Sequence, residues 1–112
     1  AVARRGPVER PTVLRVGDLV LDPAAHRAWR GETELGLSTR EFSLLELFMR
    51  NAGTALSRVQ ILDAVWDMAF ETRSNIVDVY MRYLRQKIDA PFGKSSLETI
   101  RGIGYRLRAD GG

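Results

Sequence analysis

The sequence predicts an α+β fold in which a small antiparallel sheet is followed by three helices and then by a β-hairpin. Three observations lead to this prediction. Short apolar runs, separated by turn residues, occupy the first third of the chain. Two helix-start signals, each followed by apolar residues at helical spacing, stand in the middle. Two short apolar runs around a pair of glycines lie near the end.

The chain has 112 residues, enough for one domain with a single core, which we expect over residues 13–108. Residues 1–12 have no apolar period, so we expect a flexible linker to a preceding domain. Residues 109–112 are expected to form a flexible tail. There is no cysteine and one histidine, His26, which we expect at an exposed strand position. Without a glycine-rich phosphate loop or clustered carboxylates, this composition argues against an enzyme.

We expect residues 13–37 to form a small antiparallel sheet of three or four strands. Gly17-Asp18, Asp22-Pro23 and Gly31-Glu32 divide this region into runs of strand length. No residue in these runs looks catalytic, so the expected role of the sheet is structural.

Two capping boxes mark the first two helices. Ser38 and Glu41 form the first box, and the helix that follows stops at the Asn-Ala-Gly sequence of residues 51–53. Ser57 and Gln60 form the second box and begin a short helix. Its apolar spacing predicts four core residues: Val59, Leu62, Val65 and Trp66. The connection over residues 52–56 is short, so the two helices must pack closely together.

The third helix, predicted over residues 73–89, has two contrasting sides. At about 100° per residue, one line holds four apolar residues: Val77, Met81, Leu84 and Ile88. The opposite side lacks the Glu and Lys mixture of an ordinary solvent face and holds five others: Asn75, Val79, Arg82, Tyr83 and Gln86. Arginine and carboxamide side chains pair with guanine and adenine edges, and valine can touch a thymine methyl group. We interpret this helix as one that enters a DNA major groove; an ordinary basic amphipathic helix is the alternative.

Positive charge gathers in the C-terminal third of the chain. Residues 73–108 hold eight basic and three acidic residues, a net charge of +5, whereas the remainder has a net charge of −2. Arg85 and Lys87 lie on the flanks of the third helix, where they could reach phosphates. A localised basic surface is typical of proteins that bind nucleic-acid phosphates.

A hairpin is predicted after the third helix and its stop signal over residues 90–93. Residues 97–101 and 105–107 are expected to be its strands, because the paired glycines Gly102 and Gly104 suit a tight turn with unusual backbone angles. Arg101 and Arg106 flank the tip, so we expect the hairpin to present cations there. Three helices followed by such a hairpin, or wing, form a winged helix-turn-helix.

Three motifs together resemble the DNA-binding effector domain of OmpR/PhoB-type response regulators. They are Ser-Thr-Arg-Glu-Phe-Ser-Leu-Leu over 38–45, Val-Asp-Val over 77–79 with Leu-Arg-Gln-Lys-Ile over 84–88, and Thr-Ile-Arg-Gly-Ile-Gly-Tyr over 99–105. The resemblance covers about residues 13–107. It implies a winged helix with an N-terminal sheet that binds double-stranded DNA and regulates transcription in a two-component system. A cytoplasmic protein without a cofactor is expected.

The helix face and the resemblance together give a set of candidate DNA-binding residues: Trp66, Asn75, Asp78, Val79, Arg82, Tyr83, Arg85, Gln86, Lys87, Thr99, Arg101 and Tyr105. The resemblance implies a wing contact with the backbone or minor groove and a phosphate near Trp66. Some alternatives stay open. Asp78 can instead hold a neighbouring arginine, while Trp66 and Tyr105 can instead be core residues. Tyr83 replaces a residue that is often basic in similar proteins, so the DNA sequence cannot be borrowed from a relative.

The resemblance also implies partners. A receiver domain is expected in the intact protein, and RNA polymerase is expected to meet the loop over residues 67–72. The candidate polymerase contacts are Asp67, Met68, Phe70 and Glu71. The chain has no coiled-coil heptads, so we expect the isolated domain to be monomeric. The resemblance implies that it pairs head to tail on direct repeats of DNA. A winged helix used only for protein contacts is the alternative from another class.

Overall fold

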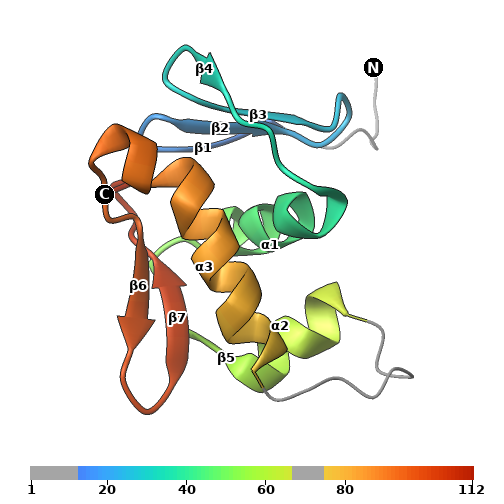
Figure 1. Ribbon diagram of the computed structural model, residues 1–112, viewed down its shortest axis with the longest axis vertical. Coiled ribbons are helices and arrows are strands. Elements are labelled where there is room, and N and C mark those ends of the chain that lie inside the picture. Colours follow the sequence, from blue (N-terminus) through green and yellow to red (C-terminus); the bar gives the residue numbers. More distant parts are fainter. Residues whose placement is uncertain (1–12, 67–74) are drawn as a thin grey trace, which may run out of the picture.

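The computed structural model describes residues 13–66 and 75–112. The linker predicted over residues 1–12, the loop over 67–72 and the first two residues of the predicted third helix lie outside these ranges. Figure 1 shows a four-stranded sheet at one end, three helices in the middle and a smaller sheet beside the last helix. The predicted α+β winged helix-turn-helix is confirmed. Within the two described ranges, no helix is long and apolar enough to cross a lipid bilayer.

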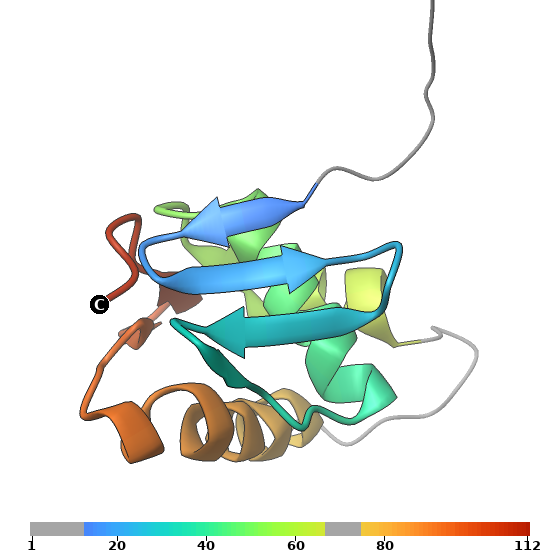
Figure 2. The ribbon, with the colours of Figure 1, turned by 90° about the horizontal axis from the view of Figure 1, so that it is seen from above.

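The N-terminal sheet has the predicted antiparallel arrangement. Its strands are β1 (Leu14–Val16), β2 (Leu19–Asp22), β3 (Arg27–Arg30) and β4 (Thr33–Glu34), paired in that order. The turns fall at the three predicted dipeptides. Figure 2 shows the sheet lying over α1 (Thr39–Arg50). The face turned toward the helices carries buried Leu19 and Leu21, so the sheet closes one side of the core.

The expected strand position of His26 is wrong. Residue 26 lies in the turn between β2 and β3 with a φ of 56°. The Asp22 carboxylate accepts hydrogen bonds from the backbone N–H groups of Ala24 and Ala25, at 3.1 and 3.3 Å, and thereby ends β2. The His26 ring stacks on Phe42 with 4.0 Å between ring centroids, which gives it a packing role.

Both predicted capping boxes are formed. In α1 the Ser38 hydroxyl accepts from the Glu41 N–H at 3.2 Å, and the Ser38 N–H donates to the Glu41 carboxylate at 2.8 Å. Helix α2 (Arg58–Val65) has the same pair of bonds between Ser57 and Gln60. The predicted core of α2 is partly wrong, because Val59 is 64% exposed and the unpredicted Ile61 is fully buried. Two residues apart on a helix are about 200° apart, so both cannot face the core.

The third helix, α3 (Ile76–Ile88), buries the predicted stripe. The side chains of Val77, Met81, Leu84 and Ile88 are all inaccessible to solvent. The helix ends in a short 3₁₀ turn, η2 (Ala90–Phe92), and Gly93 follows in the left-handed conformation with a φ of 65°. This is the stop predicted from the Ala-Pro-Phe-Gly sequence.

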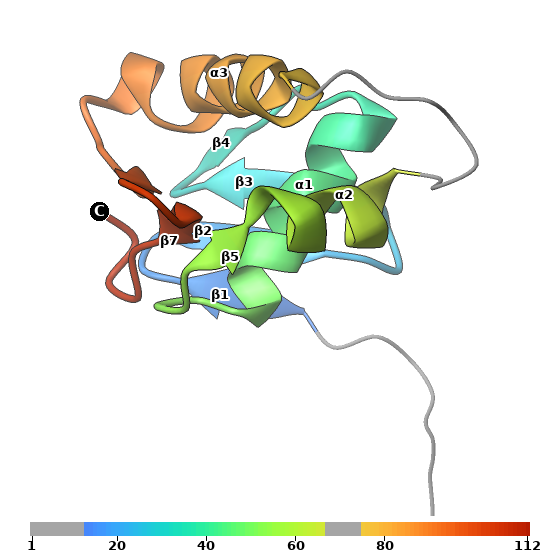
Figure 3. The same cartoon turned by 90° about the horizontal axis from the view of Figure 1, so that it is seen from below.

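The C-terminal hairpin consists of β6 (Leu97–Ile100) and β7 (Gly104–Leu107). A third strand that the sequence did not predict, β5 (Leu56–Ser57), pairs with β7, as Figure 3 shows. The strands approach so closely that a Cβ atom on Gly104 would lie 2.1 Å from the Leu56 carbonyl oxygen. Glycine is therefore required at position 104 for the wing to join the connection between α1 and α2.

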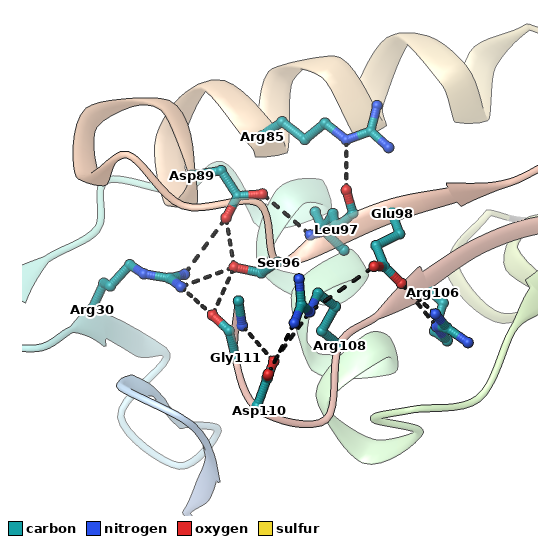
Figure 4. Close-up of polar contacts among 11 residues, drawn as sticks. Arg30, Arg85, Asp89, Ser96, Leu97, Glu98, Arg106, Arg108, Asp110 and Gly111 are labelled. Carbon is teal, nitrogen blue, oxygen red and sulfur yellow. Dashed lines mark hydrogen bonds and ion pairs between the residues drawn. The ribbon is translucent and has the colours of Figure 1, made fainter.

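A buried arginine that the sequence analysis overlooked joins the two ends of the domain. Arg30 at the end of β3 has no exposed side-chain surface, and it donates to Ser96 Oγ at 2.9 Å and to the Gly111 carbonyl (Figure 4). Its guanidinium also lies 3.3 Å from an Asp18 oxygen and 3.6 Å from an Asp89 oxygen. The segment expected as a flexible tail, residues 109–112, thus packs on the domain with Gly111 buried. A buried guanidinium needs acceptors, and this segment supplies one of them.

Candidate nucleic-acid interface

The side of α3 that points away from the core carries the predicted outward residues. Arg82, Tyr83 and Gln86 are exposed, and Val79 is partly buried. Asn75 stands at the N-cap, exposed, without a side-chain capping bond. Within residues 13–66 and 75–112, the guanidinium of Arg82 makes neither a hydrogen bond nor an ion pair. This face therefore presents an arginine and a carboxamide that are available to a ligand.

The neighbouring flank of α3 faces the wing. The Arg85 guanidinium donates to the Leu97 carbonyl at 3.2 Å, a contact visible in Figure 4, and to Thr99 Oγ1 at 2.8 Å. One helical turn before Arg82, Asp78 accepts a hydrogen bond from the Tyr105 hydroxyl. The structure therefore brings four predicted DNA-binding residues together as mutual partners: Asp78, Arg85, Thr99 and Tyr105. The open alternative for Asp78 is realised, because it also pairs with Arg58 Nε at 3.0 Å.

The protonation states of this cluster follow from its environment. Burial raises the pKa of Tyr105, and its hydrogen bond to Asp78 raises that pKa further. Burial also acts to raise the pKa of Asp78, but the hydrogen bonds from Tyr105 and Arg58 outweigh it, so the pKa of Asp78 is lowered. A protonated tyrosine thus donates to an ionised aspartate. The hydroxyl of Tyr105, a candidate DNA contact, is engaged within the domain.

Lys87 and Trp66 are both used elsewhere in the fold. Lys87 Nζ donates to the Glu41 carboxylate at 2.7 Å and to the Gly36 carbonyl at 3.0 Å, which ties α3 to the start of α1. Trp66 caps α2, is 8% exposed, and packs its ring 5.1 Å from the Arg40 guanidinium. The structure therefore gives Lys87 a role in joining α3 to α1 and places Trp66 in the core. The predicted polymerase contacts lie outside the described residues.

The wing tip presents one of the two predicted cations. Arg101 is exposed in the turn, where Gly102 has a φ of 80°, and Ile103 beside it is 53% exposed. Arg106 instead turns to Glu98, to which its Nε and Nη2 atoms donate at 3.0 and 2.6 Å (Figure 4). The expectation that both arginines serve the tip is wrong, because the β6–β7 register places Arg106 opposite a carboxylate.

A shallow pocket connects α3 with the base of the wing. Its lining includes Arg82, Arg85 and Lys94 together with Gln86. Lys94 and Arg58 are cations that the sequence analysis did not select as site residues. Lys94 follows the helix-stop glycine, and Arg58 is the first residue of α2, beside the wing. Both cations therefore lie next to a turn or a helix cap. In the part of the chain that the structure describes, no group of acidic and histidine side chains is placed to hold a metal ion.

These features define the class of protein. The domain is a winged helix whose third helix exposes a polar face, with a wing held along that helix and a cation at the wing tip. A family model described as "Transcriptional regulatory protein, C terminal" matches residues 32–107, and the chain belongs to that family.

Similar proteins show which members of this family the chain resembles. The chain is 62% identical over 112 residues to the transcriptional regulatory protein TcrA of Mycobacterium tuberculosis, a match that covers 100% of this chain and 44% of TcrA. The chain thus spans less than half the length of this relative. The DNA-binding domain of Klebsiella pneumoniae RstA, solved in complex with the RstA box, is 25% identical with a TM-score of 0.78, over 88% of this chain and 99% of that one.

A third match is to response regulator DrrB, an OmpR/PhoB homologue of Thermotoga maritima. It is 26% identical with a TM-score of 0.75, over 86% of this chain and 44% of that one. The predicted resemblance to OmpR/PhoB-type response regulators is confirmed. The family is one of transcriptional regulators and not of enzymes.

Proposed function

We propose that this chain binds double-stranded DNA sequence-specifically, as the effector domain of a two-component response regulator that controls transcription. The observation that carries the proposal is the exposed face of α3, on which Arg82, Tyr83 and Gln86 point away from the core. A B-DNA major groove, about 12 Å wide, admits one α-helix. Arg82 is the candidate for a guanine contact and Gln86 for an adenine contact.

The wing contributes the second contact. Arg101 is exposed at the wing tip, and we propose that it contacts the adjacent backbone or the minor groove while α3 occupies the major groove. Lys94 in the pocket at the wing base adds a further cation on the same side. Such phosphate contacts fix the register of a protein on DNA, and base contacts supply the sequence preference. The relatives named for transcriptional regulation and the RstA domain bound to its box support this assignment.

The intact protein has further proposed properties. Because the chain spans 44% of TcrA, we propose that a receiver domain accompanies it and that both act in the cytoplasm, where bacterial DNA resides. The loop containing Asp67, Met68, Phe70 and Glu71 is proposed to contact RNA polymerase. Its two acidic side chains add nothing to phosphate binding, which leaves the loop available for a protein partner.

Selection from a random pool of double-stranded DNA tests the proposal. The domain should enrich one short motif, and its affinity for that motif should fall steeply with salt because cations on the protein displace counterions from the phosphates. Enrichment of no motif, with binding to all sequences alike or to none, would contradict sequence-specific recognition. Absence of DNA binding at both low and physiological salt would favour a winged helix used for protein contacts.

A further inference from the structure

Among the residues that the structure describes, the wing side chains that hydrogen-bond to α3 belong to a single rung of the hairpin, and the Leu97 carbonyl on β6 also accepts from Arg85. Thr99 on β6 and Tyr105 on β7 are partners in the antiparallel register. Thr99 Oγ1 accepts from Arg85 at 2.8 Å, and the Tyr105 hydroxyl donates to Asp78. Asp78 and Arg85 are seven residues apart, which is about 10 Å along a helix axis. The rung therefore holds α3 at two separated points.

The surroundings of the rung make the link stiff. Tyr105 is 5% exposed, and its ring lies 5.4 Å from the Arg58 guanidinium and 5.5 Å from that of Arg85. Arg58 also pairs with Asp78 at 3.0 Å, so the first turn of α2 is included. Two cations near one aromatic ring, together with an ionised acceptor, restrict the tyrosine to one position.

The two points of attachment bracket the residue that faces the DNA. Arg82 lies four residues after Asp78 and three before Arg85, so it projects between them on the same side of α3. One rung nearer the base of the hairpin, the Arg106–Glu98 pair stays within the wing, and Arg101 at the tip is exposed. The rung, together with the Arg85–Leu97 carbonyl bond, thus sets the position of the wing relative to Arg82.

We propose that Thr99 and Tyr105 are positioning residues that hold the wing at a fixed separation from α3, so that Arg101 reaches DNA already aligned with Arg82. The proposal rests on the proposed function, because it takes Arg82 and Arg101 as DNA contacts. A contact made by a preorganised element is stronger than the same contact made by a mobile one, since the binding free energy then does not include the entropy cost of ordering that element.

The test combines Thr99→Val and Tyr105→Phe, which remove the two hydroxyls and keep the shapes of both side chains. In the native background Arg101→Ala should weaken binding to the selected site by roughly tenfold, as expected for one charge-assisted hydrogen bond. In the Thr99→Val/Tyr105→Phe background Arg101→Ala should cost less than about threefold, because an unaligned wing contributes little. Arg82→Ala should cost the same in both backgrounds, since the core holds α3.

A matched control distinguishes the positioning role from a general loss of stability in the wing. Glu98→Gln removes the negative charge from the Arg106–Glu98 pair on the adjacent rung and changes no bond to α3. It should leave the effect of Arg101→Ala unchanged, even if both variants lower the unfolding midpoint equally. Amide hydrogen exchange at residues 101–104, measured without DNA, should become faster in the Thr99→Val/Tyr105→Phe variant than in Glu98→Gln.

Each other outcome has a definite meaning. An undiminished effect of Arg101→Ala in the hydroxyl-deleted background would overturn the positioning role and leave DNA binding intact. If neither Arg82→Ala nor Arg101→Ala weakens binding in the native background, the proposed function fails, and the positioning role fails with it.

Discussion

Arg82 and Arg101 are both exposed cations, but one stands on a helix face beside Gln86 and the other on a turn. We expect Arg82→Ala to cost roughly 1–3 kcal/mol at the preferred site and to flatten the sequence preference, because it removes a base contact. Arg101→Ala should weaken specific and random DNA more evenly and reduce the salt slope by about one unit. Titrations of both DNAs at several salt concentrations provide the measurement. An equal loss of preference in the two variants would contradict this division.

Glu41 is a second residue whose surroundings make a prediction, this one about acid stability. Burial acts to raise its pKa, but hydrogen bonds from Lys87 and Ser38 outweigh burial, so the pKa lies below its ordinary value of 4.5. A lowered folded-state pKa gives stability that is complete above the unfolded-state value and is lost as pH falls through the folded-state value.

Glu41→Gln should therefore lower the free energy of unfolding at neutral pH, by about 1.5–3 kcal/mol, and make its decline below about pH 4.5 shallower. Denaturant titrations between pH 3 and pH 7 measure both effects. The control is Glu46→Gln on the same helix, which breaks only the surface pair with Arg50. Identical acid profiles for the native chain and Glu41→Gln would show that the Lys87 contact contributes nothing.

At the scale of elements, the wing depends on its junction with β5. A methyl group at position 104 would meet the Leu56 carbonyl at 2.1 Å, so the strands must separate or the turn must distort. Gly104→Ala should destabilise the fold by about 1–3 kcal/mol and should also weaken DNA binding through displacement of Arg101. Gly36→Ala is the matched control, because position 36 has open space and no positive φ. Equal melting temperatures for the two variants would exclude a tight β5–β7 approach.

At the scale of the whole molecule, Arg30 joins the N-terminal sheet to the end of α3 and to the C-terminal segment. Its removal leaves the buried Asp89 carboxylate without its cation, so Arg30→Ala should cost about 3–5 kcal/mol. Arg27→Ala, on the same strand, removes an exposed pair with Glu34 and an exposed contact with the Trp29 ring, and should change stability little. Thermal unfolding of both variants checks the contrast, and a small effect of Arg30→Ala would mean that water can replace its partners.

Assembly is the other prediction at this scale. One recognition helix covers few base pairs, so specificity under physiological conditions usually needs two half-sites. We expect the isolated domain to be monomeric in sedimentation, to bind one half-site weakly, and to bind direct repeats about 10–11 base pairs apart more tightly. A stable dimer without DNA, or tighter binding to inverted repeats, would contradict head-to-tail pairing.

Local sequence signals determined most of the fold. The capping boxes at Ser38 and Ser57, the buried stripe of α3 and the glycine turn of the wing are each set by residues within one element. Hydrogen bonds and apolar spacing of that kind act over three or four positions, so they can be read directly from the chain. The exposed face with Arg82 and Gln86 was predicted for the same reason, since it is the side of α3 that the core stripe leaves outside.

Only the tertiary structure decided which polar side chains remain available for DNA. Tyr105 and Asp78 are 27 residues apart, Lys87 and Glu41 are 46 apart, and Arg30 and Gly111 are 81 apart. Strand β5 has two residues, too few for a period, and exists because β7 lies beside it. A polar group hydrogen-bonds to an acceptor that the fold brings within about 3 Å of it. The number of residues between two groups along the chain does not indicate how far apart they lie in the fold. The sequence therefore predicted the reading face of α3, while long-range packing engaged Asp78, Arg85 and Lys87 within the fold.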